Sequence, residues 1–181
     1  FSVSGGGSVF DVVQTGATVT VAARADVTPG SQEGLTVQVA GQGESQAPLT
    51  LRIGEAPSDQ PRGGTVSLTC TVGSNCATDV IGAPGEYDPF VGKRGGGLIL
   101  ETVSGGSCTF GSVQKANDRG VTVAWPDSRG PGGTCTVGYT VRDAQGRIGE
   151  GSIELNAQGV PRAPATITPE KIEGDRITFV V

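Results

Sequence analysis

The stretch from Thr134 to Leu155 constrains the fold more than any other part of the chain. Its first half alternates apolar or aromatic side chains with polar or small ones: Cys135, Val137, Tyr139 and Val141 against Thr136, Gly138, Thr140 and Arg142. Period-two alternation places one set of side chains on a buried face and the other in solvent, so it predicts a strand. The segment Asp143-Ala144-Gln145-Gly146 has the chemistry of a tight reversal, and a second strand follows, ending in Ile153 and Leu155. We therefore expect the closing hairpin of a β-sandwich.

Similar alternation recurs along the whole chain, and turn residues separate the apolar runs. The runs that we interpret as strands are 18–23, 35–39, 48–53, 65–72, 98–103, 108–113, 121–125 and 176–181, with two short strands around a glycine-rich turn in 1–13. The 31 glycines and 11 prolines among 181 residues argue against a helical protein, because both residues are costly inside helices. The sequence thus predicts an all-β chain of antiparallel β-sandwich domains in tandem.

Two segments rich in proline and glycine, Glu55 to Gly64 and Gly159 to Thr166, have the composition of linkers. We therefore expect a small Ig-like sandwich over 1–56, either compact or incomplete, a linker over 57–64, and a larger sandwich over 65–158. Residues 159–181 then form a second linker and a further strand. That strand either pairs back onto the second sandwich or opens a third domain.

Four cysteines at positions 70, 76, 108 and 135 form an even set without a CxxC pair, and the chain has no histidine. Disulfides are therefore favoured over a metal site, and disulfides indicate an oxidising compartment, extracellular or at the cell surface. Three pairings are open. We favour Cys70–Cys76 with Cys108–Cys135, because the members of each pair lie near one hairpin or strand pair.

Charge and composition exclude several function classes. A net charge of −5 repels phosphate backbones and anionic lipid headgroups, so neither nucleic acid nor a membrane surface is expected as a partner. No apolar run reaches membrane-spanning length. The glycine clusters 5–7 and 95–97 lack the following G-K-[ST] of a phosphate-binding loop, and we expect no cofactor. Without histidine the chain cannot build a Ser-His-Asp or Cys-His arrangement, so we expect no enzyme.

The second sandwich carries a resemblance in three of its segments: NCATDVIGAPGEYDPFVGK, GGGLILETVSGG and GYTVRDAQGRIGEGSIEL. The residues that match are Asp88, Pro89 and Phe90, then Leu98 and Leu100, then Tyr139, Thr140, Val141, Asp143 and Gly146. In this pattern the chain resembles bacterial cadherin-like and Ig-like repeats that occur in tandem on large surface proteins. The tail PRAPATITPEKIEGDRITFVV resembles the opening of a fibronectin type III domain. The resemblance implies Ig-like or cadherin-like sandwiches in a secreted or surface protein.

Two acidic segments are candidates for calcium binding, since cadherin relatives bind calcium at domain junctions. Asp143 lacks the D-x-[DN]-x-[DN]-G order and stands between Arg142 and Arg147, so we interpret it as a turn residue that accepts backbone hydrogen bonds. The loop Glu86-Tyr87-Asp88 is a slightly better candidate, but it too is better explained as a turn. We interpret Trp125, the single tryptophan, as a plug between the sheets rather than a sugar-stacking platform.

Two functions remain. The first is a non-catalytic spacer that projects a functional head from a surface, with the neighbouring domains of the parent chain as its partners. The second is a module that binds an envelope glycan or protein through the loops 79–97 and 127–133. The residues expected to contact such a ligand are Glu86, Tyr87, Asp88 and Asp127.

Overall fold

The computed structural model of the chain describes all residues except 41–44, 106, 162–167, 174–175 and 181. All regular elements in the described part are β-strands, so the all-β prediction is confirmed. No helix long and apolar enough to cross a membrane occurs among these residues.

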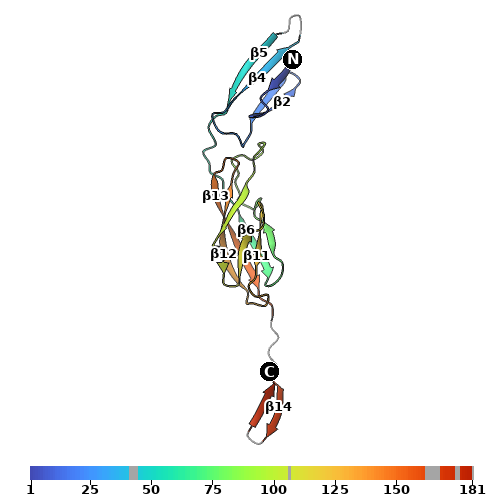
Figure 1. The fold of residues 1–181 in the computed structure, drawn as a ribbon, viewed down its shortest axis with the longest axis vertical. Helices are drawn as coiled ribbons and strands as arrows, with labels where there is room; N and C mark the ends of the chain where they lie inside the picture. Colours follow the sequence, from blue (N-terminus) through green and yellow to red (C-terminus); the bar gives the residue numbers. More distant parts are fainter. Residues whose placement is uncertain (41–44, 106, 162–167, 174–175, 181) are drawn as a thin grey trace.

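The central part of the chain folds into two four-stranded sheets (Figure 1). Their strands are β6 (Thr65–Thr71), β7 (Ala77–Asp79), β8 (Ile99–Ser104), β9 (Ser107–Cys108), β10 (Gly111–Lys115), β11 (Gly120–Ala124), β12 (Gly133–Arg142) and β13 (Ile148–Gln158). One sheet has the order β6-β13-β12-β8 and the other β7-β11-β10-β9. Strands β7, β10 and β11 therefore lie in one sheet, and β8, β12 and β13 lie in the other. This division of the strands is that of an Ig-like sandwich.

The hairpin β12–β13 is the centre of this sandwich, as the sequence predicts. Its register pairs Val137 with Ile153 and Cys135 with Leu155. Strand β6 pairs with β13 in parallel, whereas the other pairs are antiparallel. Strand β7 lies between the runs 65–72 and 98–103, where the sequence predicts no strand. Its three residues are too few to give a periodic signal.

The core fills the space between these two sheets with the inward-facing residues of each strand. It contains Val72, Val80, Ile81, Leu98, Leu100, Phe110, Val113, Val121, Val123, Val137, Tyr139, Val141, Ile153, Leu155 and Ala157, with Cys70 and Cys76 at one end. Trp125 packs against this core but stays partly exposed, and its Nε1 donates to the carbonyl of Ser74 at 2.7 Å. The expectation that Trp125 packs between the sheets is met in part, since Trp125 lies against the core just after β11, whereas Tyr139 is buried inside it.

Tyr139 is almost completely buried, and its hydroxyl group donates to the carbonyl of Gly64 at 2.9 Å. Gly63 and Gly151 leave room for the ring, since a Cβ at either position would collide with it. Burial raises the pKa of the Tyr139 phenol. The two glycines are thus required by the packing of one aromatic side chain.

Both disulfides join the two sheets of the sandwich. Cys70 of β6 pairs with Cys76, which immediately precedes β7, at a Cα–Cα distance of 5.9 Å. Cys108 of β9 pairs with Cys135 of β12 at 6.2 Å. This is the pairing that the sequence favours, but the reason differs from the expected one, because the partners belong to opposite sheets rather than to one hairpin.

The N-terminal strands form two smaller sheets, β1-β4-β5 and β2-β3. Their bounds are β1 (Ser2–Gly5), β2 (Phe10–Thr15), β3 (Thr18–Ala23), β4 (Gln32–Val39) and β5 (Ser45–Arg52). Phe10 and Leu35 are buried between the sheets. The alternation Leu49, Leu51, Ile53 buries Ile53 as expected, but Leu49 is 49% exposed. We call residues 1–53 the N-terminal unit.

The C-terminal strand expected over 176–181 is observed as β15 (Arg176–Val180), which pairs with β14 (Thr168–Glu173) in a two-stranded sheet. Its neighbour β14 was not predicted. Neither strand joins a sheet of the sandwich among the described residues, and Val181 lies outside them.

Candidate functional site: the junction between the N-terminal unit and the sandwich

The two loops expected to bind a ligand lie at opposite ends of the sandwich. The loop 79–97 lies beside the turn 143–147, because Arg147 packs over the ring of Phe90. The loop 127–133 lies at the other end of β13, where Gly133 pairs with Ala157, and Ser128 fills the space beside Gly73. The two loops therefore do not form one surface.

The turn 143–147 is fixed by the side chain of Asp143, which is completely buried. Its Oδ1 accepts the backbone N–H groups of Gln145 and Arg147, each at 2.9 Å, and its Oδ2 accepts Nε of Arg147 at 2.8 Å. Gly146 has a φ of +82°, which favours glycine at this position. Asp143 is thus a turn residue whose oxygens already have partners within the chain.

The other acidic candidates also fix their own loops. Asp88 closes the loop 88–97, since its two oxygens accept the N–H groups of Phe90 at 2.9 Å and Gly97 at 3.0 Å. Glu86 accepts the N–H of Gly82 at 2.7 Å. Asp127, at the far end of the sandwich, accepts the N–H of Arg129 at 2.8 Å. In the described part of the chain, no three His, Cys, Asp or Glu side chains are grouped so that they could hold a metal ion.

Tyr87 connects the same loop to the linker. Its backbone forms an isolated bridge with Arg62, and its hydroxyl group donates to Asp59 at 3.3 Å. Desolvation and the nearby negative charge of Asp59 raise the pKa of Tyr87. Tyr87 is partly exposed, yet both its backbone and its hydroxyl group contribute to holding the chain between the two units.

The loop 88–97 and the turn 143–147 together contact the N-terminal unit. The carbonyl of Arg94 accepts the N–H of Ala25 at 2.9 Å, and the Arg94 guanidinium pairs with Asp11 at 2.9 Å. Gln145 extends Nε2 toward the carbonyls of Ala25 and Val27, each at 3.4 Å. Ala25 is fully buried in this contact. We call these residues, with Arg147 and the linker, the junction.

Arg147 is the most connected side chain of the junction. Besides its bond to Asp143, its Nη1 donates to the carbonyl of Pro57 in the linker at 2.6 Å, and its guanidinium lies 5.2 Å from the centroid of the buried Phe90 ring. Pro61, farther along the linker, is buried against Gly149, where a Cβ would collide with the Pro61 carbonyl. The linker is therefore bound along the end of the sandwich rather than free.

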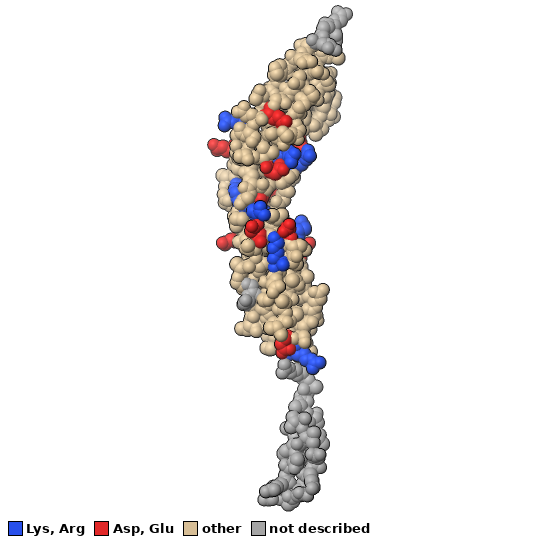
Figure 2. Space-filling model, in the orientation of Figure 1, with Lys and Arg blue, Asp and Glu red and all other residues tan. Residues whose placement is uncertain are grey.

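A further ion pair, between Arg24 and Asp26, lies on the N-terminal side of the junction. Arg24 donates to both oxygens of Asp26, from Nε at 3.1 Å and from Nη2 at 2.8 Å. This hydrogen bonding lowers the pKa of Asp26 and raises that of Arg24. Gly95 approaches Asp26 so closely that a Cβ would lie 2.8 Å from its Cγ. In Figure 2 charged side chains of both signs gather in the middle of the molecule, whereas the tip of the N-terminal unit is largely uncharged.

Sequence reasoning selected Asp143 and the loop containing Asp88, but not the residues that contact the N-terminal unit. Arg94 and Gln145 carry those contacts, and Arg147 holds the linker at Pro57. The sequence signal that could have indicated these contacts was the pair of arginines around Asp143, Arg142 and Arg147. We used these two charges only to argue against calcium binding. Most of these contacts involve a backbone carbonyl, of Arg94, Ala25, Val27 or Pro57, and a backbone group leaves no trace in a side-chain pattern.

Comparisons with known proteins give distant structural similarity only. No protein-family model matches the chain. No curated protein matches it either. Among solved structures, "PcdhgB3 EC1-4" is 10% identical with a TM-score of 0.38, and the protocadherin gammaB7 EC3-6 cis-dimer is 16% identical with a TM-score of 0.38. Each match covers 87% of this chain, which spans 41% of the matched chain. Human protocadherin-24 EC1-2 is 12% identical with a TM-score of 0.34, over 88% of this chain and 83% of that chain.

Proposed function

We propose that this chain is a non-catalytic spacer segment of a secreted or cell-surface multidomain protein of the bacterial tandem-repeat type. The observation that carries this proposal is the bonded junction. A spacer transmits position only if its units keep their orientation, and a free linker would not allow that. Here the linker is held by Arg147 and Tyr87, and the turn around Ala25 is held by Arg94 and Gln145.

The acidic residues support the same conclusion. Asp88 and Asp143 have both oxygens bonded within the chain, so a ligand would have to break those bonds. A ligand that bound the loop 88–97 at the Arg94 end would also compete with the N-terminal unit. The proposal therefore favours a spacer that holds neighbouring domains in position over a module that binds a ligand through the loops 79–97 and 127–133.

The disulfides support the proposed location. Both cysteine pairs are closed within the sandwich, as is typical of proteins that mature in an oxidising compartment. We place the protein outside the cytoplasm, with neighbouring domains of the parent chain as its partners and with no nucleic acid or membrane insertion. The domain layout within this proposal is 1–56, linker 57–64, sandwich 65–158, and a segment 159–181 that begins a fibronectin type III-like domain.

The test is whether the N-terminal unit and the sandwich tumble as one body. Residual dipolar couplings measured on the full chain should fit a single alignment tensor for residues 1–53 and 65–158. A double variant, Arg147→Ala with Gln145→Ala, should separate the two tensors, because it removes the bonds to Pro57, Ala25 and Val27. Arg129→Ala, at the far end of the sandwich, is the control.

Two results would contradict the proposal. One is independent alignment of the two units in the unsubstituted chain. The other is saturable binding of an envelope polysaccharide or protein that is lost on substitution of Glu86 or Tyr87, because that result would indicate a recognition module.

A further inference from the structure

The chain enters and leaves the sandwich at opposite ends. The linker leads into β6 at the junction, and β13 runs from the turn 143–147 to the far end, where the carbonyl of Gln158 accepts the N–H of Val72 at 2.9 Å. In Figure 1 the N-terminal unit and the hairpin β14–β15 accordingly lie beyond opposite ends of the sandwich. A pull on the two ends of the chain therefore draws β6 toward the junction and β13 away from it.

Strands β6 and β13 must slide past each other under that pull, because they are parallel neighbours. Their register pairs seven residues, from Thr65 with Ser152 to Thr71 with Gln158. The hydrogen bonds of a parallel ladder are spaced along the strands, so a pull along the strands loads all of them together. In the described part of the chain β6 is the last strand of its sheet, whereas β13 also pairs with β12 over ten positions. The β6–β13 pair is therefore the contact that yields first within the sandwich.

Side chains on both faces of the sheet strengthen this pair. Inside the sandwich, Leu155 is almost completely buried and lies opposite Leu68. On the outer face, Oγ of Ser67 donates to Oε2 of Glu154 at 3.3 Å. The hydroxyl group of Tyr139 holds the backbone just before β6. Because a slip of one residue would turn the buried side chains outward, the pair keeps its register until it breaks.

The disulfides determine where the pull acts after β6 has been released. Cys70 of β6 is joined to Cys76, so a pull on β6 passes directly to the opposite sheet at β7. Cys108 is joined to Cys135, so the pull then passes directly from β9 to β12. Residues 109–134, with strands β10 and β11, lie outside that covalent path and are not stretched. The disulfides therefore limit how far the chain can extend.

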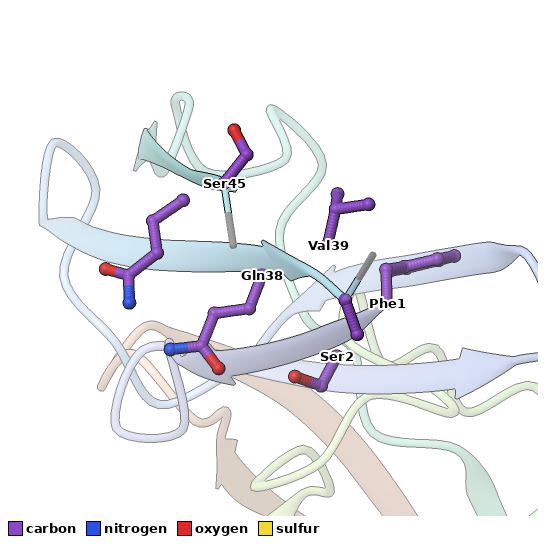
Figure 3. Close-up of a pocket in the computed structure, with 7 residues that line it drawn as sticks. Phe1, Ser2, Gln38, Val39 and Ser45 are labelled. Atoms are coloured by element: carbon purple, nitrogen blue, oxygen red, sulfur yellow. The ribbon is translucent and has the colours of Figure 1, made fainter. Parts of the chain in front are cut away.

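The N-terminal unit has neither of these features. Its first and last strands are separated by β4 in the sheet order, and β1 pairs with β4 over only four positions. Figure 3 shows the outer end of that pair, where Ser2 lies beside Gln38 and a pocket is lined by Phe1 and Val39 as well. No cysteine occurs in 1–53. We therefore expect this unit to yield at a lower force than the sandwich and to extend fully.

We propose that the sandwich is the part of the chain that carries tension: the β6–β13 pair resists extension, and the two disulfides limit extension once that pair has yielded. This inference deepens the proposed spacer function and rests on it, because only a spacer that is anchored at one end and engaged at the other is placed under tension. When the pull ends, less chain has to fold again than in a sandwich without disulfides.

The experiment stretches single molecules of the full chain between tethers at its two ends. Forced unfolding measures the barrier that the β6–β13 pair creates rather than the equilibrium stability. We expect one step from the N-terminal unit at lower force and one from the sandwich at higher force. Reducing the disulfides should lengthen only the sandwich step, by about 100 Å, because the two bridges span 6 and 27 sequence positions at roughly 3.3 Å per residue.

A change in the direction of the pull isolates the β6–β13 pair. A tether is fixed at position 74 through an azide-bearing residue in place of Ser74, which is exposed and follows β6 at the far end of the sandwich. Pulling between this tether and the C-terminus separates the two strands from one end, so that their bonds break one after another. The sandwich should then yield at a severalfold lower force. The same variant pulled from its two ends is the matched control, because its fold and its stability are identical.

A proline in either strand tests the bonds themselves. The N–H of Ser152 donates to the carbonyl of Gly64 at 3.1 Å, so the even-numbered residues of β6 and β13 bond to each other. Asn156→Pro should lower the force at which the sandwich yields, because it removes one donor from the pair. Thr69→Pro removes a donor that points to the open side of β6 and should leave that force unchanged. Both side chains are exposed, so neither substitution opens the core.

Two results would overturn the proposal. One is an equal force for the sandwich in both pulling directions, and the other is a sandwich step whose length does not change on reduction. Neither result would contradict the spacer function, which is tested by the alignment of the two units. Independent alignment of the two units would instead contradict the spacer function and leave the measured resistance of the sandwich unchanged.

Discussion

The sandwich and the N-terminal unit are built from the same kinds of strand, but they differ in what covers them. In the sandwich, two four-stranded sheets face each other and bury Tyr139, Leu100, Ile153 and Leu155 almost completely. In the N-terminal unit, a three-stranded sheet faces a two-stranded one, and Leu49 is half exposed. Alternation creates an apolar face in both regions, but a core forms only where a second layer of matching size lies opposite that face.

The largest expected difference comes from truncating one leucine in each region. Leu155→Ala should lower the free energy of unfolding of the sandwich by about 4 kcal/mol, because it removes a buried side chain and leaves a cavity. Leu49→Ala should cost less than about 1 kcal/mol, since half of that side chain already contacts water. Urea titrations followed by circular dichroism would measure both. Equal losses would mean that Leu49 is buried in solution.

The disulfides sharpen the comparison, because the sandwich has both of them. Replacing Cys108 and Cys135 by serine should destabilise the sandwich by about 3.5 kcal/mol in the chain-entropy model, since the two residues are 27 positions apart. Replacing Cys70 and Cys76, which are 6 positions apart, should cost about 2 kcal/mol. Thermal melts of the two double variants would rank them. The reverse order would show that packing around Cys70 and Cys76, not loop closure, determines the effect.

Alkaline pH should destabilise the sandwich, because Tyr139 ionises. Burial raises the pKa of this phenol above its ordinary value of 10.0, so the folded state favours the neutral form. The resulting stability is present below the unfolded pKa of about 10 and is lost as pH rises through the folded pKa. Melting temperatures of the unsubstituted chain and of Tyr139→Phe, measured between pH 9 and pH 11.5, should converge as pH rises. Parallel curves would contradict this assignment.

Lowering the pH should weaken the N-terminal side of the junction. Of the effects predicted here, we expect this one to be the smallest. The Arg24 hydrogen bonds lower the pKa of Asp26, so its contribution is present above the unfolded pKa of about 3.9 and is lost as pH falls through the folded pKa. Amide chemical shifts of residues 24–27 should change between pH 5 and pH 2 in the unsubstituted chain. In Asp26→Asn these changes should be smaller. Asp127→Asn, at the far end of the sandwich, is the control. Identical titrations in this region for Asp26→Asn and the unsubstituted chain would argue against the role of Asp26.

Prediction from sequence succeeded where a local pattern was long enough. The two strands of the hairpin β12–β13 contain 10 and 11 residues, and both formed with the expected turn between them. It failed for β7 and β14: β7 has only three residues, and β14 begins at Thr168 beside residues that we assigned to a linker. It interpreted Trp125 as a plug between the sheets, whereas Trp125 only packs against the core and Tyr139 is the aromatic side chain buried within it.

The candidate site was predicted only in part. Asp143, Glu86 and Asp88 were correctly interpreted as turn residues, since Asp and Glu accept nearby N–H groups through local bonds. The side chains of Arg94, Gln145 and Arg147 reach groups outside the sandwich that are 83 to 120 positions away in the sequence. No local pattern marks such a partner, so the junction could not be predicted.

By itself, the sequence determined that the chain is made of β-strands and that its four cysteines form disulfides, because alternation, turn chemistry and the absence of histidine are properties of short segments. Tertiary structure decided which faces are buried, which sheets the disulfides join, and how Arg147 holds the linker to the sandwich. These features depend on groups that are distant in sequence and meet only when the sheets have packed. The same reason explains why the alternating leucines Leu98 and Leu100 are buried in the sandwich, whereas Leu49 of the N-terminal unit is half exposed.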